Sequence, residues 1–394
     1  MARDAGVAGN LPRMYAYRFL RDFLLVMPAM VPLQRACGLG ATQILAVQAV
    51  FSIASMCFEL PSGFIADVVG RRRALIAGAG CTSLALAAYA AAQGLAWFMA
   101  AEIVMALGYS LISGTESAMI FDSLRRAGRE ESYRRVEGRA EALTRTGTAI
   151  AALAGGALAA LALRLPFAVN SATAVVMVLI ALGLVEPARD ALERRAPARQ
   201  ILRIASESLR DGRIASATVL GAGIFATGVI GIWGYLMRLT DSGVGPVGVG
   251  LFFAAFQGGS AIGAAGSERI GAVLGRGSYA VLGVVPLVLG ACAIWDGPLP
   301  VMAAPLAALA WGFSTPLLLQ IVNRATSSDR RATVLSVSAM AGRILFVVLA
   351  PLFGFAVDRG LGRWGFGVLA LVIVISAAAA GVIRVARGSG LRSG

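Results

Sequence analysis

The sequence predicts an all-α membrane protein whose twelve transmembrane helices form two six-helix bundles. Hydrophobic residues make up 58% of the chain, charged residues 14%, and the mean hydropathy is +0.78. Soluble domains carry about 25% charged residues, so this composition indicates a polytopic membrane protein. The charged residues separate apolar runs, and only the segment 186–213, near the middle of the chain, is both long and polar.

Twelve apolar runs give the expected positions of the helices, since a transmembrane helix needs about 20 mostly apolar residues. In chain order they cover 14–34, 41–65, 74–93, 96–121, 140–163, 166–185, 214–237, 245–266, 278–295, 299–322, 332–356 and 365–384. We therefore expect an N-terminal bundle over 1–185, a cytoplasmic linker over 186–213 and a C-terminal bundle over 214–394. Within the linker, the pattern of 199–210 predicts an amphipathic helix on the membrane surface.

The placement of arginine predicts the orientation in the membrane. All 35 basic residues are arginine. With both termini inside, the inner segments hold 26 of them, the outer loops hold five and four fall within helices. Short loops rich in positive charge stay in the cytoplasm, so both termini and the linker are expected there.

A short charged hairpin joins the second and third apolar runs. Residues 63–73 read Gly-Phe-Ile-Ala-Asp-Val-Val-Gly-Arg-Arg-Arg. This resembles the signature loop of the major facilitator superfamily, Gly-x-x-x-Asp-(Arg/Lys)-x-Gly-Arg-(Arg/Lys), with Val68 at a usually basic position. The matching positions are Gly63, Asp67, Gly70, Arg71 and Arg72. The resemblance implies a transporter that works by alternating access, with an inner gate formed by Asp67, Arg71 and Asp122.

A weak internal repeat supports the two-bundle architecture. At an offset of 201 residues, 67–70 corresponds to 268–271, and 118–122 corresponds to 319–323. Each segment lies at the inner end of the matching helix. Parallel repeats of six helices build the major facilitator fold, with the substrate site near the midplane between them.

Two further features narrow the resemblance. Residues 59–63 and 113–124 are similar to a bacterial subgroup of transporters. In the fifth run, Gly147, Gly155 and Gly156 match three of the five positions of the antiporter signature Gly-x-x-x-Gly-Pro-x-x-Gly-Gly. Ordinary packing of small residues between helices is the alternative explanation for these glycines.

Charged and polar residues inside the N-terminal helices are candidates for function, because charge at membrane depth is costly. Arg18 and Asp22 are four residues apart and could pair along one helix. A stripe on the fourth helix should face the cavity, as the resemblance implies, and its members are Glu102, Tyr109, Ser113 and Glu116. The candidates for substrate contact in this half are Arg18, Glu102, Tyr109 and Ser113. The chain has no histidine, so the proton-carrying candidates are Asp22 and Glu116. Glu59 and Arg145 are expected to brace helices near the inner surface.

The C-terminal half offers fewer candidates. Those for substrate contact are Trp233, Tyr235, Gln257, Trp311, Gln320 and Asn323, and for the aromatic residues helix packing is an equal alternative. Arg343 lies about 11 residues into its helix, hence roughly 16 Å along it and close to the midplane. Its guanidinium needs either a protein carboxylate, for which Glu59 is the candidate, or an anionic group on the substrate.

Several classes of function find no support in the sequence. The four cysteines have no metal-ligand spacing and read as small buried hydrophobes. Without histidine, a phosphate-binding loop or a nucleophile motif, we expect no enzyme activity, cofactor or metal. The net charge of +14 is spread along the chain, which argues against nucleic acid. We do not expect a removable signal peptide at the N-terminus, because no small-residue cleavage site follows a clean apolar core there.

The function that the sequence favours is proton-coupled export of a small organic molecule across the bacterial inner membrane by a monomer. Uptake or facilitated diffusion on the same fold is the first alternative. A lipid flippase or a membrane receptor is the second. The polar stripe on the fourth helix favours a transporter over a flippase, which should have an apolar lateral opening.

Overall fold

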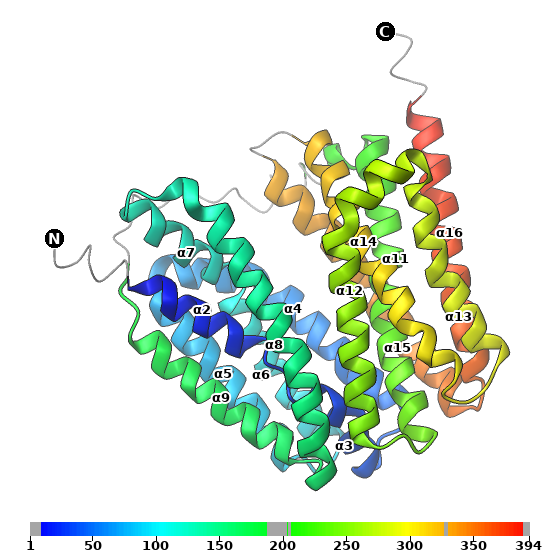
Figure 1. The fold of residues 1–394 in the computed structure, drawn as a ribbon, viewed down its shortest axis with the longest axis horizontal. Coiled ribbons are helices and arrows are strands. Elements are labelled where there is room, and N and C mark those ends of the chain that lie inside the picture. The colour runs from blue at the N-terminus through cyan, green and yellow to red at the C-terminus, as the bar shows by residue number, and fades with distance from the viewer. Residues whose placement is uncertain (1–8, 187–202, 204–205, 327–329, 389–394) are drawn as a thin grey trace. The chain divides into compact units, whose positions relative to one another are not determined.

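The computed structural model describes residues 9–186, 203, 206–326 and 330–388, and every regular element in these residues is a helix (Figure 1). The chain divides into two compact units. The first unit comprises Met1–Leu39, Val47–Glu193 and Val244–Ala254, and the second comprises Gly40–Ala46, Arg194–Gly243 and Ala255–Gly394. Most of the predicted linker and half of its predicted amphipathic helix lie outside the described residues, so the predicted domain boundaries stay predictions.

The first six predicted runs each coincide with one helix or with two consecutive helices. These are α2 (Asn10–Arg21), α3 (Met27–Ala36), α4 (Ala41–Val69), α5 (Arg71–Ala91), α6 (Leu95–Ile112), α7 (Thr115–Arg126), the 3-10 turn η1 (Glu130–Ser132), α8 (Tyr133–Leu161) and α9 (Leu165–Leu182). The first run is thus split into α2 and α3, and the fourth into α6 and α7. Helix α8 begins seven residues before the predicted start of the fifth run.

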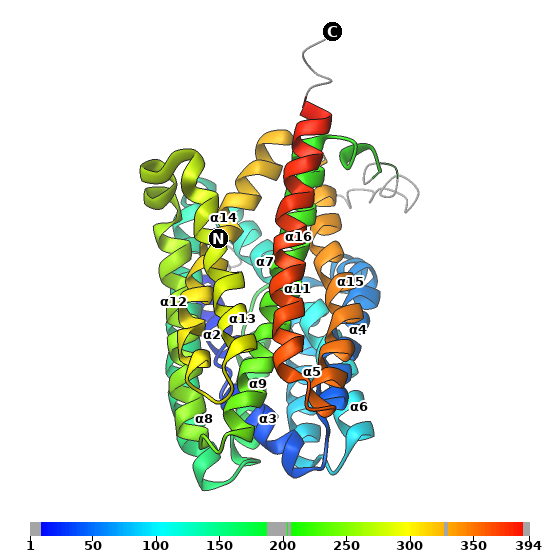
Figure 2. The same ribbon diagram turned by 90° about the vertical axis from the view of Figure 1, so that its right-hand side faces the viewer.

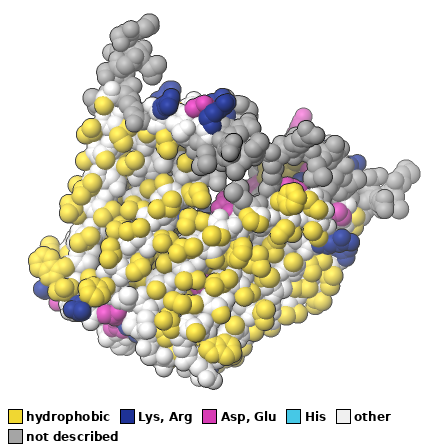
Figure 3. All heavy atoms as spheres, turned by 180° about the vertical axis from the view of Figure 1, so that it is seen from behind, with side chains coloured by type: hydrophobic (Ala, Val, Ile, Leu, Met, Phe, Trp, Pro, Cys, Tyr) yellow, Lys and Arg dark blue, Asp and Glu magenta, His cyan; other side chains and the backbone are white. Residues whose placement is uncertain are grey.

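The last six runs are α11 (Gly212–Asp241), α12 (Pro246–Leu274), η2 (Gly275–Gly283) with α13 (Val284–Ile294), η3 (Pro300–Ala303) with α14 (Ala304–Ala325), α15 (Arg331–Asp358) and α16 (Gly362–Gly388). In the described part of the chain, nine helical spans are long and apolar enough to cross a membrane. The outward-facing residues agree with a lipid environment. Leu287, Trp364 and Ile262 are each more than 60% exposed. On the face shown in Figure 3, most visible side chains are hydrophobic and the charged ones gather toward the margins.

The first unit is held together by close helix contacts at glycine. A Cβ atom on Gly78 of α5 would lie 3.0 Å from the carbonyl oxygen of Gly108, and a Cβ on Gly108 would lie 2.8 Å from that of Gly78. Helices α5 and α6 therefore approach until their backbones touch, which is how small residues favour association in a membrane. Eleven residues further along α5, the ring of Tyr89 stacks on that of Phe167 of α9, with the ring centroids 5.4 Å apart.

Helix α11 is the central element of the second unit. It packs against α14, α15 and α16 (Figure 2). Of its most apolar 18-residue stretch, 72% is buried, which is the highest value among the nine membrane-spanning candidates in the described residues. The rings of Phe353 and Phe366 pack against Gly234 of α11. A Cβ atom added to Gly234 would lie 2.8 Å from the first ring and 2.9 Å from the second. The N–H groups that begin α4 also belong to this unit. Ala41 and Thr42 donate their backbone N–H groups to the carboxylate of Asp358 at 2.7 and 2.9 Å, which fixes the start of α4.

Helices α12 and α14 of the second unit approach each other closely at two glycines. An added Cβ on Gly312 would lie 1.9 Å from the carbonyl oxygen of Ser260, and one on Gly263 would lie 1.9 Å from that of Leu309. No flexible side chain can yield here, because the opposing atoms are backbone. The two helices can pack this way only with glycine at both positions.

We expect Gly312→Ala to lower the stability of the protein by about 1–3 kcal/mol, because the methyl group forces α12 and α14 apart. Gly290→Ala on α13 is the matched control, since nothing lies within 4 Å of the Cβ that it adds. Thermal unfolding of the two variants in the same detergent measures the difference. Equal unfolding temperatures would show that the contact is not as tight as described.

Candidate functional site

Around the buried Glu116, five charged residues of the first unit form a charge cluster, which consists of Arg18, Arg21, Asp22, Glu116 and Glu137. Arg18 donates from Nε to Glu116 Oε2 at 3.0 Å and from Nη1 to Glu137 Oε1 at 2.7 Å. Arg21 donates from Nη1 to the same Oε2 atom of Glu116 at 2.6 Å and from Nε to Asp22 Oδ1 at 3.1 Å. The side chain of Glu116 is 2% exposed. The cluster therefore joins α2, α7 and α8 around one buried carboxylate.

The cluster forms where the first helix is interrupted. Helix α2 ends at Arg21 and α3 begins at Met27, which leaves backbone groups without helical partners. Two side chains from other helices satisfy them. Thr148 donates its hydroxyl to the carbonyl of Asp22 at 3.0 Å, and Asn170 donates from Nδ2 to the carbonyl of Phe23 at 2.7 Å. The break between α2 and α3 is thus stabilised by side chains of α8 and α9.

The fourth helix is interrupted beside the same cluster. Gly114, with φ of +76°, separates α6 from α7. Glu116 then falls in the first turn of α7, while Arg18 and Arg21 fall in the last turn of α2. The helix macrodipole favours an acid at an N-terminus and a base at a C-terminus. Both helix ends therefore stabilise the charges that meet in the cluster.

The charges of the cluster do not balance when all five groups are ionised, because three carboxylates face two guanidiniums. Ser117 adds a hydroxyl that lies 2.8 Å from Arg18 Nη2 and 3.2 Å from Glu137 Oε1. The Oε1 atom of Glu116 and the Oε2 atom of Glu137 are buried and accept no hydrogen bond from the described residues. Buried polar atoms are normally hydrogen-bonded. A donor group of a solute would satisfy this unused acceptor capacity, whereas a proton on Glu116 would remove the excess negative charge.

The predicted pair of Arg18 with Asp22 is wrong. Asp22 pairs instead with its neighbour Arg21, and Arg18 pairs with Glu116 and Glu137. The physical reason is that α2 ends at Arg21, so Asp22 lies outside the helix and the spacing of four residues no longer places the two side chains on one face. Arg145, predicted as a brace, pairs at 2.8 Å with Glu141 on its own helix, and Glu59 is exposed.

The predicted stripe on the fourth helix is divided by the break at Gly114. Glu102 and Glu116 are buried, whereas Tyr109 is 45% exposed and Ser113 is also exposed. The structure joins Glu102 to two other polar side chains. Tyr89 donates its hydroxyl to Glu102 Oε1, and Gln48 donates to the same atom at 3.4 Å. Of the four stripe residues, only Glu116 belongs to the charge cluster.

The hairpin motif places its residues against α7 and α9. Arg71 pairs with Asp122, as the resemblance implies, and donates to the carbonyl of Ala118 at 2.6 Å. Gly70 has a φ of +122°, a conformation that L side chains rarely adopt. The carboxylate of Glu186 accepts from the backbone N–H groups of Arg71 and Arg72 at 2.9 and 2.8 Å and so caps the N-terminus of α5.

The other residues of the hairpin motif lie in the following surroundings. Arg72 also donates from Nη2 to the carbonyl of Leu182 at 2.6 Å. Gly63 and Asp67 are partly buried on α4. Sequence reasoning missed Glu186, Ser117 and Glu137. Glu137 was in reach of prediction, since it lies four residues into α8, but the apolar run used to place that helix begins only at 140.

The candidates of the second unit occupy different environments. Trp233 and Tyr235 are buried on α11, and Tyr235 stacks on Phe366 at 5.6 Å. Trp311 packs against Phe256 at 6.2 Å and next to Gly228. These contacts are those of helix packing. The polar candidates are less buried: Gln257 and Asn323 are intermediate and Gln320 is exposed. Arg343 is partly buried on α15, with no ion-pair partner within the described part of its unit.

The fold and the charge cluster define a polytopic helical membrane protein with a polar centre in its first bundle. The chain belongs to the Major Facilitator Superfamily, whose family model matches residues 19–347. It is therefore a membrane transporter of that family. A comparison with curated proteins gives no match.

Solved structures with the same fold cover nearly the whole chain. A variant of the nucleoside transporter NupG has a TM-score of 0.76 and 15% identity, over 96% of this chain and 99% of that one. A bacterial homologue of the human lysosomal transporter Spinster, in an inward-facing and unoccupied conformation, has a TM-score of 0.74 and 16% identity, over 97% of both chains. A variant of the peptide transporter POT has a TM-score of 0.72 and 13% identity, over 96% and 98%. At these identities the likeness shows the fold alone.

Proposed function

We propose that this protein is a secondary transporter that couples the movement of a small organic molecule to protons, with export from the bacterial cytoplasm as its direction. The observation that carries the proposal is the buried Glu116 carboxylate, which contacts two guanidiniums through one oxygen and leaves the other without a donor among the described residues. A carboxylate so placed can take up and release a proton without leaving the cluster.

The coupling follows from the contacts of Glu116. When Glu116 is ionised, it attracts Arg18 and Arg21 and holds α2 against α7. When a proton binds, this attraction falls, and the two guanidiniums keep only Asp22 and Glu137 as anionic partners within the cluster. Protonation therefore changes the relative free energies of two arrangements of the broken helices, which is what a coupling ion must do. No histidine exists in the chain to take this role.

The inner gate and the orientation are parts of the same proposal. Arg71 and Asp122 are paired within the first unit, which supports their assignment to a gate together with Asp67. Export is supported by the likeness of Gly147, Gly155 and Gly156 to the antiporter signature. Each of the three also has a packing role, since an added Cβ would meet Phe19, Leu25 and Pro246 respectively at under 3.0 Å. The cytoplasmic location of both termini rests on the arginine pattern alone.

Purified protein in vesicles that enclose a pH-sensitive dye tests the proposal. We expect one or more solutes from a panel of small organic compounds to dissipate an imposed pH gradient, while vesicles without protein keep it. Reversing the gradient gives the direction of solute movement. Solute flux without proton movement would replace the proposal with a facilitator. Exchange of a fluorescent phospholipid without any solute flux would replace it with a flippase.

A further inference from the structure

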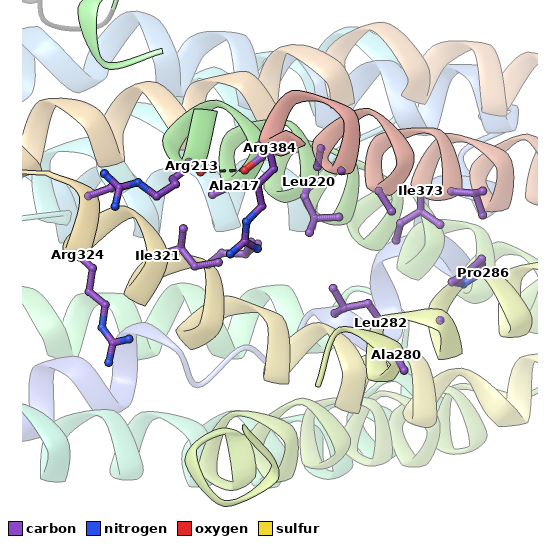
Figure 4. Close-up of a pocket in the computed structure, with 18 residues that line it drawn as sticks. Arg213, Ala217, Leu220, Ala280, Leu282, Pro286, Ile321, Arg324, Ile373 and Arg384 are labelled. Atoms are coloured by element: carbon purple, nitrogen blue, oxygen red, sulfur yellow. Dashed lines mark hydrogen bonds between the residues drawn. The ribbon is translucent and has the colours of Figure 1, made fainter. Parts of the chain in front are cut away.

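The second unit contains a cavity of about 630 Å³ that is separate from the charge cluster (Figure 4). It lies within the bundle, between α11, α14, α16 and the segment formed by η2 and α13. Its wall is mostly apolar and includes Leu220, Leu282, Leu318, Ile321 and Ile373. Among the residues that the structure describes, no aspartate or glutamate lines it. The cavity therefore suits a ligand with a large apolar part.

Three arginines line one end of this cavity. Arg213 is in the first turn of α11, Arg324 is in the last turn of α14, and Arg384 is near the end of α16. Figure 4 shows Arg213 and Arg324 at one end of the cavity, Arg384 extending toward Ile321, and Pro286 at the opposite end. The cavity thus has a basic end and an apolar end.

The partners of these arginines differ. Arg213 pairs at 3.1 Å with Asp211. Burial raises the pKa of the Asp211 carboxyl, but the hydrogen bonds from Arg213 and its charge outweigh burial, so the pKa lies below its ordinary value. Asp211 therefore stays ionised at neutral pH and offsets Arg213. Arg324 has no carboxylate within ion-pair distance among the described residues. A positive charge thus remains at the basic end.

The cavity is long enough for part of an acyl chain. Arg384 and Ile373 line it from the same helix, eleven residues apart, which corresponds to roughly 16 Å along the axis. We infer an entrance between α16 and the segment opposite, because small residues line the cavity on both sides. An added Cβ on Gly381 or on Gly283 would meet nothing within 4 Å, and Ala377 and Ala280 beside them are exposed. A chain could enter sideways through this opening.

We propose that this cavity is a binding site for an anionic phospholipid, whose phosphate is bound by Arg324 and Arg384 and whose acyl chain lies along the apolar wall. Guanidinium groups bind phosphate oxygens in a bidentate manner. Basic pockets between transmembrane helices are sites for anionic headgroups. The basic end lies at helix ends that the arginine pattern predicts on the cytoplasmic side. Anionic lipids are concentrated in the cytoplasmic leaflet of the membrane. The lipid is a bound component of the second unit and is independent of the charge cluster.

Native mass spectrometry of the full-length protein tests the proposal with dioleoyl phosphatidylglycerol and dioleoyl phosphatidylcholine as probes. We expect the wild-type protein to retain phosphatidylglycerol about tenfold better than phosphatidylcholine. The double variant Arg324→Gln with Arg384→Gln should lose this preference. Arg331→Gln, at the exposed start of α15 and outside the cavity, is the matched control and should keep it.

A second pair of variants tests the cavity itself. Gly381→Trp should fill the entrance and abolish retention of phosphatidylglycerol, whereas Gly290→Trp, where an added Cβ also meets nothing, lies outside the cavity and should not. If Gly381→Trp fails to fold, Gly283→Leu replaces it. Equal retention of both lipids would show simple filling of an apolar space and would overturn the proposal. So would displacement of the lipid by glycerol phosphate, which would make the site one for free anions, or unchanged retention in the filled variant.

Discussion

Glu116→Gln is expected to abolish uphill, pH-driven accumulation of solute, by more than about tenfold, while downhill exchange continues. Glutamine keeps a carbonyl oxygen that can accept from Arg18 and Arg21, but it cannot take up a proton. The substitution also removes one negative charge, so two guanidiniums then face the two carboxylates of Asp22 and Glu137. The cluster stays paired, and we expect the protein to fold.

The measurement is transport by vesicles, with and without a pH gradient, for the solutes that dissipate the gradient with the wild-type protein. Glu141→Gln is the matched control, because Glu141 is an exposed residue of α8 that pairs only with Arg145 among the described residues. It should leave both activities unchanged. Full uphill transport by Glu116→Gln would exclude Glu116 as the proton carrier and direct the search to Asp22.

A different substitution in the cluster distinguishes structure from coupling. Arg18→Ala leaves Glu116 with one guanidinium and Glu137 with none within the cluster. Removing one partner of a buried ion pair costs about 3–5 kcal/mol, so this variant should be unstable as well as inactive. The comparison matters because Glu116→Gln should be stable and uncoupled. The two phenotypes separate a proton site from a structural ion pair.

The positions of the helices could be predicted from the sequence, because runs of about 20 apolar residues are a property of the local sequence. The interruption of the first helix could not. It depends on Thr148 and Asn170, which satisfy the carbonyls of Asp22 and Phe23 from more than 100 residues away. Nothing between Arg18 and Met27 indicates that these partners exist. The wrong pairing of Arg18 followed from this one omission.

The candidate site was predicted in part for the same reason. Arg18, Asp22 and Glu116 were identified because charges within apolar runs stand out. Glu137 was not, because it precedes an apolar run and looks like a loop residue. The caps at Glu186 and Asp358 were also beyond prediction, since each carboxylate binds a helix start that is over 100 residues away in the chain. Polar contacts between residues far apart in the chain thus could not be predicted from the local sequence pattern.

Arg343→Ala is expected to remove the binding of an anionic substrate, and Arg343→Lys to weaken it. Arg343 lies twelve residues after the first residue of α15, roughly 18 Å along a helix of 28 residues, and so near its middle. A guanidinium at that depth costs several kcal/mol unless it is paired or hydrated. Within the described part of the second unit no carboxylate pairs with it, which favours an anion brought by the substrate. Lysine keeps the charge but loses the bidentate geometry.

The assay compares binding of solutes that the vesicles transport with that of their uncharged amide or ester analogues. Arg359→Ala, at the end of the same helix, is the matched control and should bind both as the wild-type protein does. With Arg343→Ala, the preference for the charged solute over its analogue should disappear while thermal unfolding is unchanged. If the variant instead binds the charged solute normally and unfolds at a lower temperature, Arg343 is a structural residue and the substrate needs no anionic group.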